Sequence, residues 1–340
     1  MRTWLLELLV CPECRSDLRL DAAADSGADV TSGTLACASG HEFPITNGVP
    51  RFVQHALSAD QARTRDSFGY EWTRLYPEHG HTAQERQAER DIFLEYTRTV
   101  PSEFHGRLVL DAGCGNGRYA TLSSDWGARV VAVDISAAVD IAHGNVGDRR
   151  DVAVAQADLF KLPFRAGTFD IVYSIGVLHH TPDAKGAFAA LQPLVRPGGF
   201  LSIFMHGQGN RALYAVNRLL RGWTSKASYS TTWRFCLALT GVGRILAKTP
   251  FVGPVLYMVG RQVLFFSPDQ HNNFDHYSAG FTSFHRKDEI RGWYAGWDDV
   301  VVRYAGVASE SIYARGARPQ APAPSAQPAE KGAPCVAAVR

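Results

Sequence analysis

Three closely spaced glycines form the stretch with the clearest chemical potential. An apolar run ends in Asp111, and glycines then occupy alternate positions at Gly113, Gly115 and Gly117. Because glycine has no Cβ, a turn of this kind between a strand and a helix lets a ligand approach the backbone closely. The spacing differs from the dinucleotide fingerprint G-x-G-x-x-G, and no Gly-Lys-Ser/Thr sequence follows as in a phosphate loop. The stretch therefore predicts a ligand-binding turn of a different type.

A second set of reactive residues lies near the N-terminus at metal-ligand spacing. Cys11 and Cys14 form a C-x-x-C pair, and Cys37 and His41 offer a second pair. Thiolates and an imidazole at these spacings suit a tetrahedral zinc ion, and four protein ligands would make the site structural. His41 is the nearest candidate for the fourth ligand, with His55 as the alternative. A redox role is less favoured, because a redox C-x-x-C pair should follow a strand and open a helix.

Acidic side chains end or follow the next two apolar runs. Residues 128–134 are nearly all apolar, as in a strand covered on both faces, and end in Asp134. A carboxylate at this place can accept hydrogen bonds from both hydroxyls of a ribose. The alternative is a helix N-cap, supplied by Asp134 or by Ser136. Residues 151–156 predict the next strand, and Asp158 after it could be a simple turn residue.

The elements that must position these residues alternate between strand and helix from residue 106 onwards. This alternation predicts an α/β fold in which helices cover both faces of a parallel sheet. Strands are predicted at 107–111, 128–134, 151–156, from 171, and at 200–205, with a helix after 285 and two strands between 297 and 315.

The chain divides accordingly into four parts. We predict a zinc-bound module at 1–55, a polar helical lid or linker at 56–105, a main domain at 106–315 and a tail at 316–340. The tail has almost no large apolar residues, so it is predicted to be disordered.

The glycine turn, Asp134, residues 157–159 and residues 162–183 occur in the order of the motifs of class I S-adenosylmethionine (SAM)-dependent methyltransferases. The last of these stretches is the most specific, and it resembles the ubiquinone- and menaquinone-biosynthesis C-methyltransferases of methyltransferase type 11. The resemblance covers roughly residues 106–206. It implies a Rossmann-like sheet with helices on both faces and an antiparallel last strand. The first 55 residues resemble the zinc-ribbon domain that precedes many bacterial methyltransferase domains.

The resemblance also implies roles for single residues. The glycine turn would wrap the methionine part of SAM, Asp134 would bind the ribose, Asp158 would bond the adenine amino group, and Leu159 would pack on the adenine ring. The aromatic stretch 68–76 either buries an aromatic face on the main domain or forms a lid whose Tyr70 or Arg74 reaches the SAM carboxylate. The candidate cofactor-binding residues are Asp111, Gly113, Gly115, Gly117, Asp134, Ile135, Asp158, Leu159, Ser174, Tyr70 and Arg74.

Two adjacent histidines, His179 and His180, follow the fourth strand, at the edge where open α/β sheets bind ligands. Imidazole is well matched to proton transfer near neutral pH, and a base is needed if the methyl acceptor must lose a proton. We expect one histidine to face the cofactor and acceptor, with His179 slightly preferred over His180, and the other to hold the turn before Pro182. Tyr173 and Ser174 are secondary candidates.

Residues 207–280 exceed what the minimal domain needs. They contain three helix-like apolar stretches at 212–220, 233–247 and 255–266, with arginines and lysines interspersed. These stretches could form a packed helical cap, a cap that encloses an apolar substrate pocket, or an amphipathic surface that contacts a membrane or an acyl carrier. The polar segment 267–277 is predicted to be a loop that either supplies substrate contacts or merely connects. The residues to consider in it are His271, His276 and Tyr277.

Composition narrows the function further. The formal net charge is +2 and 20% of the residues are charged, without any block of five like charges, which disfavours a dedicated nucleic-acid surface. No apolar run reaches the length of a membrane span, and the N-terminus lacks the features of a signal peptide. Cysteines at metal-ligand spacing fit a reducing compartment, so we predict a cytoplasmic protein.

Three functions follow from these observations, in order of preference. The first is a SAM-dependent methyltransferase that acts on a small, apolar or aromatic acceptor at carbon, oxygen or nitrogen. The second is an rRNA base methyltransferase, because large-subunit rRNA guanine-N1 methyltransferases pair a similar zinc module with this fold. The third is a non-catalytic SAM-binding regulator. The sequence does not predict an oligomeric state.

Overall fold

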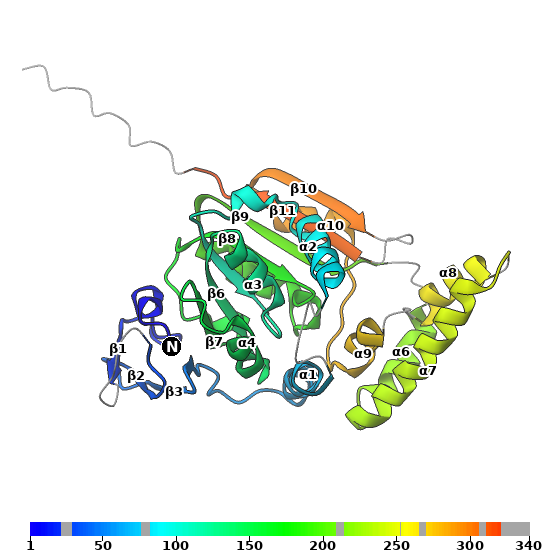
Figure 1. The fold of residues 1–340 in the computed structure, drawn as a ribbon, viewed down its shortest axis with the longest axis horizontal. Helices are drawn as coiled ribbons and strands as arrows, with labels where there is room; N and C mark the ends of the chain where they lie inside the picture. The colour runs from blue at the N-terminus through cyan, green and yellow to red at the C-terminus, as the bar shows by residue number, and fades with distance from the viewer. Residues whose placement is uncertain are drawn as a thin grey trace, which may run out of the picture.

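A computed structural model of the chain is organised around one seven-stranded sheet with the strand order β10-β11-β9-β8-β5-β6-β7 (Figure 1). It describes residues 1–21, 29–75, 82–208, 214–251, 253–264, 270–305 and 311–320. The strands are β5 (Leu108–Ala112), β6 (Arg129–Asp134), β7 (Val152–Gln156), β8 (Phe169–Ile175), β9 (Val195–His206), β10 (Asp298–Ala305) and β11 (Ser311–Ala317). Strands β5 to β9 pair in parallel, whereas β11 is antiparallel to both β9 and β10. The predicted Rossmann-like sheet with an antiparallel last strand is confirmed.

Both faces of the sheet are buried, which explains the continuous apolar strands. In β6, Val130 and Ala132 belong to the core on one face, and Val131 and Val133 belong to the core on the other. Helices α2 (Ala83–Thr97), α3 (Arg118–Asp125) and α4 (Ala138–Val146) pack on the first face. Helices α5 (Ala184–Leu191) and α10 (Lys287–Trp293) pack on the second face together with the N-terminal module.

The N-terminal module is a small antiparallel sheet. The 3-10 turn η1 (Thr3–Leu8) precedes β1 (Leu18–Asp21), β2 (Gly33–Cys37), β3 (Glu42–Thr46) and β4 (Val49–Pro50), which pair in that order. Asn47 and Gly48 both have positive φ values and form the predicted turn between β3 and β4. Residues 22–28 of the polar segment between the two cysteine pairs lie outside the described residues.

This module docks on the β7 edge of the main sheet. Arg51 bridges Gln156 in parallel, and the Phe52 amide donates to the Gln156 carbonyl at 2.8 Å. Leu9 forms a second bridge with Phe164. The module thus pairs with backbone groups of β7 that would lack hydrogen-bond partners if β7 were an exposed edge strand.

Helix α1 (Ala59–Tyr70) begins at a capping box, in which Ser58 and Gln61 exchange side-chain and backbone hydrogen bonds. It continues into a π-helical turn, η2 (Glu71–Leu75). Together with α2, these elements confirm the helical character predicted for the segment.

The long insertion forms α6 (Tyr214–Thr224), α7 (Tyr229–Lys248) and α8 (Gly253–Leu264), close to the three predicted stretches. Figure 1 shows these three helices beyond α1 and α9 as seen from the sheet. We call these helices and the described residues that connect them the α6–α8 arm. None of the helices in the described part of the chain has both the length and the apolar character needed to cross a bilayer.

The prediction of a loop at 267–277 is wrong for most of that segment, because Gln270–Ser278 forms helix α9. Phe274 and Tyr277 are fully buried in it, and the neighbouring polar groups have buried partners. Asn273 donates to Thr240 at 2.8 Å, and His276 Nε2 lies 3.0 Å from Asn217 Oδ1. A polar sequence can therefore form a packed helix when side chains on other helices bond some of its buried polar groups.

The C-terminal strand β11 continues two residues beyond the predicted domain boundary at 315. Most of the tail that was predicted to be disordered, residues 321–340, lies outside the described residues.

Candidate functional site

The four predicted metal ligands converge in the N-terminal module. Cys14 Sγ lies 3.7 Å from Cys37 Sγ, and His41 Nδ1 lies 3.5 Å from Cys11 Sγ and 3.3 Å from Cys37 Sγ. Tetrahedral zinc, with bonds of about 2.3 Å to sulfur and about 2.0 Å to nitrogen, would require edges of roughly 3.8 Å and roughly 3.5 Å. All four donor atoms lie within 4.8 Å of one another. The donor set therefore fits one tetrahedral metal ion.

Two tight turns hold this cluster. The Arg15 amide donates to the Cys11 carbonyl at 2.9 Å, and the Gly40 amide donates to the Cys37 carbonyl at 3.0 Å. The alternative ligand, His55, points elsewhere, because its Nε2 atom pairs with Asp158 Oδ2 at 3.0 Å. His41 is thus the fourth donor, and His55 connects the module to the main domain.

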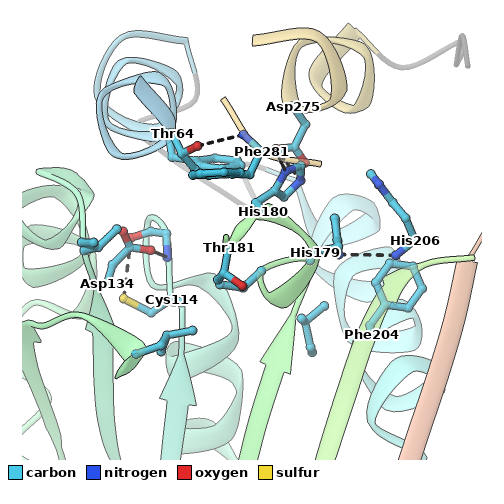
Figure 2. A pocket seen from close by; sticks show the side chains of 18 of the residues that line it. Thr64, Cys114, Asp134, His179, His180, Thr181, Phe204, His206, Asp275 and Phe281 are labelled. Carbon is cyan, nitrogen blue, oxygen red and sulfur yellow. Dashed lines mark hydrogen bonds and ion pairs between the residues drawn. The ribbon is translucent and has the colours of Figure 1, made fainter. Parts of the chain in front are cut away.

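A second site is a cavity of about 430 Å³ at the carboxyl ends of the parallel strands. The strand ends and the turns after them form one wall, and α1, η2 and α9 form the other. In Figure 2, Asp134 and Cys114 lie on one side of this cavity, and His179, His206 and Phe204 lie on the other. Its volume falls within the range of small-molecule sites.

The glycine turn forms the floor of the cavity where a ligand would approach most closely. Gly113, Gly115 and Gly117 have φ values of +94°, +54° and +85°, which other residues adopt only with strain. A Cβ on Gly113 would collide with the Val177 side chain, and one on Gly115 would lie 2.8 Å from Trp72 Cε2. Backbone without side chains is thus required on this floor.

Asp134 lines the cavity beside this turn. Its Oδ2 accepts from the Gly115 amide at 3.1 Å, and its Oδ1 accepts from the Ser136 amide at 2.8 Å and from the Ser136 hydroxyl at 2.7 Å. Ser136 in turn accepts from the Ala138 amide at the start of α4. Carboxylate oxygens can accept more than one bond each, so Asp134 can tie these turns together and still bind ribose hydroxyls.

Three more predicted cofactor residues line the cavity: Ile135, Asp158 and Leu159. Asp158 Oδ1 accepts from the Phe160 amide at 3.0 Å, while Oδ2 faces His55. The pair with His55 fixes the orientation of this carboxylate, so it can present an oxygen to a ligand amino group.

Six other predicted residues are described by the structure but do not line the cavity, and one of them is Gly117, where an added Cβ would meet Ala142 of α4. Asp111 is fully buried behind the glycine turn, where burial raises its pKa to about 8 and Tyr173 is its hydrogen-bond partner. The Tyr173 hydroxyl also lies 3.2 Å from Ser123, and Ser174 donates to the Ala112 carbonyl at 2.7 Å. These positions favour structural roles in the core.

The last two of these six residues are Tyr70 and Arg74. Tyr70 stacks on Tyr229 in the contact between α1 and the arm, and Arg74 is exposed.

The lid side of the cavity is made by a different face of α1 and of its continuation η2. Its lining residues recur at helical spacing, which places them on one side of the helix. They are Gln61, Thr64, Arg65, Phe68 and Trp72. This helical spacing could have been read from the sequence. Tyr70 and Arg74, which lie on another face of the same segment, were instead selected from the sequence.

A half-buried charged group near Trp72, Arg118, was also overlooked. Arg118, the first residue of α3, lines the cavity with its guanidinium 5.5 Å from the Trp72 ring and 4.6 Å from the Tyr119 ring. Glu71, fully buried, forms an ion pair with His271 from α9. The signal for Arg118 was its place directly after the third glycine, where a cation can reach an anionic ligand group held by the turn.

Hydrogen bonds assign the protons of the two adjacent histidines. His180 Nδ1 lies 3.0 Å from the Phe281 carbonyl, and because a carbonyl only accepts, Nδ1 carries the proton. Its Nε2 is therefore the basic atom, and it lies 4.0 Å from Asp275 Oδ1. His179 has the opposite arrangement, since its Nδ1 accepts from the His206 amide at 3.3 Å and leaves the proton on Nε2.

Burial sets the charge of these rings. Desolvation lowers the pKa of His180 to about 4, and it lowers the pKa of His179 and His206 well below the usual value. The imidazoles are therefore neutral at neutral pH, and His180 presents a basic nitrogen while His179 presents an N–H. The sequence slightly preferred His179 as the base, whereas this geometry favours His180.

Comparison with known proteins places two families on the chain. Residues 110–203 match a methyltransferase domain, and residues 4–48 match the family described as Trm112p-like protein. The chain thus carries a class I SAM-dependent methyltransferase domain preceded by a Trm112-like region.

Curated relatives agree with this assignment. A tRNA (carboxymethyluridine(34)-5-O)-methyltransferase of Macaca fascicularis is 33% identical over 147 residues, which are 42% of this chain and 21% of that protein. A ubiquinone biosynthesis O-methyltransferase of Aromatoleum aromaticum is 39% identical over 98 residues, 28% of this chain and 42% of that protein. An uncharacterized chloroplastic methyltransferase of Arabidopsis thaliana is 28% identical over 218 residues, 57% of this chain and 60% of that protein. The chain therefore spans less than two thirds of each of these proteins.

Proposed function

We propose that this chain transfers the methyl group of SAM to an oxygen atom of a small, apolar or aromatic acceptor. The observation that carries the proposal is the neutral His180, whose basic Nε2 is held at the wall of a cavity built around the glycine turn. The aromatic rings that line the cavity, among them Phe68, Trp72 and Phe204, favour an apolar acceptor. Two relatives are also named as O-methyltransferases.

Residues of this chain would hold the cofactor in one orientation. Bound SAM supplies an electrophilic methyl group on sulfur. The glycine turn would receive the methionine part, and Arg118 would pair with its carboxylate. Asp134 would accept from the ribose hydroxyls, and Asp158 would accept from the adenine amino group. Phe68 of α1 and Trp72 of η2 would close the site and exclude water.

The histidine pair would handle the acceptor. Methyl transfer is an in-line displacement, so positioning the acceptor oxygen is the main requirement. His179 would donate its Nε2 hydrogen to that oxygen, and His180 would remove the proton through Nε2. Asp275, 4.0 Å away, would stabilise the imidazolium that forms on His180.

The Cys11, Cys14, Cys37 and His41 cluster would hold a structural zinc ion. A closed set of four protein ligands leaves no open position for a substrate, so the ion would stabilise the module. Because the module packs on β7, a folded module would also support the turn that carries Asp158.

A second candidate acceptor is RNA, and the similarity to the tRNA enzyme favours it over the rRNA base considered from the sequence. The specific likeness to ubiquinone- and menaquinone-biosynthesis enzymes, the cytoplasmic location and the non-catalytic alternative remain predictions.

The test is release of S-adenosylhomocysteine from SAM in the presence of lipophilic phenols, lipophilic carboxylic acids or unmodified tRNA. We expect turnover with a phenol or carboxylic acid, lost in His180→Gln and kept in His285→Gln, whose ring lies outside the cavity lining. Turnover with tRNA but with none of the small acceptors would identify RNA as the methyl acceptor. Cofactor binding without turnover on any acceptor would favour the non-catalytic alternative.

A further inference from the structure

The α6–α8 arm exposes an unusual amount of apolar surface. Ten of the fourteen large apolar side chains that are exposed in the described residues belong to it, so the feature is local. Leu219, Ile245 and Phe251 are the most exposed, at 78%, 67% and 95%. Isolated exposed apolar residues are normal, but a concentration on one structural unit indicates a surface that binds something.

The charged residues in and around the arm are all cations. Residues 207–268 contain eight arginines and lysines and not a single aspartate or glutamate, whereas the whole chain has 35 cations and 33 anions. Five of the eight cations are exposed among the described residues: Arg218, Lys226, Arg234, Arg244 and Lys248. The arm is therefore a cationic, apolar unit on a protein that is otherwise slightly acidic.

Helical spacing places both properties together on α7. Arg234, Leu237, Ile245 and Lys248 are exposed, while the buried residues Thr232, Cys236, Thr240 and Gly243 recur on the opposite side of the helix. A helix with one packed face and one face of aliphatic residues flanked by cations can lie in a membrane interface.

We propose that the α6–α8 arm docks this protein on an anionic membrane surface, with the exposed aliphatic and aromatic side chains entering the interface and the cations pairing with lipid phosphates. Phosphate-rich RNA would also attract the cations, but it offers no apolar phase for Leu219, Ile245 or Phe251. A second copy of the chain would bring two arms of the same charge together, which disfavours self-association. This docking does not depend on the proposed methyl transfer.

The arm is also connected to the cavity. Thr240 of α7 bonds Asn273 of α9, and Asp275 on the same helix lines the cavity. If the proposed function holds, an enzyme placed in this way would receive its apolar acceptor from the bilayer.

The experiment is cosedimentation of the full chain with vesicles of equal parts phosphatidylglycerol and phosphatidylcholine, and with vesicles of phosphatidylcholine alone. We expect binding to the anionic vesicles that is much weaker on the zwitterionic ones. Leu219→Gln with Ile245→Gln and Phe251→Gln, and separately Arg234→Glu with Lys248→Glu, should each weaken it at least about tenfold. Val100→Gln and Arg303→Glu, exposed outside the arm, are the matched controls and should bind like the parent.

All the substituted side chains are exposed, so we expect each variant to fold. Circular dichroism checks this. Absence of binding to anionic vesicles, or equal binding by folded arm variants, would overturn the proposal. A tRNA gel shift that needs the arm cations but not the apolar residues would assign the surface to RNA. A dimer of the parent that the apolar variant abolishes would assign the surface to self-association.

Discussion

Two clusters of side chains that could ligate a metal lie in the described part of this chain, and their geometry separates their chemistry. In the N-terminal module, Cys11, Cys14, Cys37 and His41 turn their donor atoms toward one point. Beside the cavity, His179, His180 and His206 lie equally close together. Residue types and distances alone would make both clusters metal sites.

Two ring nitrogens of the second cluster, His179 Nδ1 and His180 Nδ1, already bond backbone groups. His179 Nδ1 accepts a backbone N–H, and His180 Nδ1 donates to a carbonyl, so the two rings offer one N–H and one lone pair rather than two converging lone pairs. A proton donor next to a proton acceptor suits an acceptor hydroxyl. The partner of each nitrogen, rather than the density of histidines, thus distinguishes a metal site from an acid–base site.

The largest effect is expected from removing the metal. Cys11→Ser with Cys14→Ser should reduce the zinc content from one ion per chain to none and unfold the module, because a closed site contributes its binding energy to folding. Metal analysis and circular dichroism measure both changes. His55→Ala and His180→Gln should each keep one zinc; loss of zinc in either would show that the assignment of the clusters is wrong.

Removing the base should be the next largest effect. His180→Gln is expected to lower kcat about 10²- to 10⁴-fold with little change in cofactor affinity. Because the base must be neutral and its pKa is lowered to about 4, kcat of the parent should not decline through the usual histidine range near pH 6.5. A decline there, in protein that is still folded, would contradict the assignment.

Asp134→Ala should weaken binding of S-adenosylhomocysteine by about 100-fold, because two charge-assisted bonds to the ribose are lost. Isothermal titration calorimetry gives the affinity. Asp125→Ala, an exposed carboxylate paired with Arg149, is the matched control and should bind like the parent. An unchanged affinity in Asp134→Ala would exclude the ribose role.

Acid should destabilise the cavity cluster well above the usual range of carboxylates. Burial lowers the pKa of His179, His180, His206 and His276, so the stability that these neutral rings contribute is present above about pH 6.5 and is lost as pH falls toward the folded pKa values. The raised pKa of Asp111 acts in the opposite direction, but it is one group against four. We expect Tm to fall by roughly several degrees between about pH 7 and about pH 5. A Tm that is constant over this interval would contradict the burial of neutral imidazoles.

The smallest effect concerns the lid. Trp72→Ala should weaken cofactor affinity about tenfold through lost ring contacts, whereas Arg74→Ala, two residues along and exposed, should leave it unchanged. Calorimetry of both variants measures this difference. A larger loss of affinity in Arg74→Ala than in Trp72→Ala would support the sequence prediction that Arg74 reaches the SAM carboxylate.

Much of the fold was readable from local patterns. The strands are short apolar runs that end in turn residues, so the sheet, the glycine turn and the cavity-lining Asp134 could be predicted before any contact was known. Helix α9 could not, because its polar residues are satisfied by Asn217 and Thr240 on other helices.

The finer features of the site depend on partners far along the chain. The protonation of His180 follows from the carbonyl of Phe281, and the orientation of Asp158 follows from His55 in the N-terminal module. Sequence spacing carries no information on such pairs. The face of α1 that lines the cavity was readable from helical spacing, but it competes with an equally aromatic face around Tyr70.

The central claim is that the chain has one closed metal site and one separate cofactor site. Native mass spectrometry of the freshly purified protein, with and without S-adenosylhomocysteine, tests it most directly. The parent should carry one zinc ion and gain one cofactor adduct, and Asp134→Ala should keep the zinc and lose the adduct. Two metal ions per chain, or no cofactor adduct on the parent, would contradict the account.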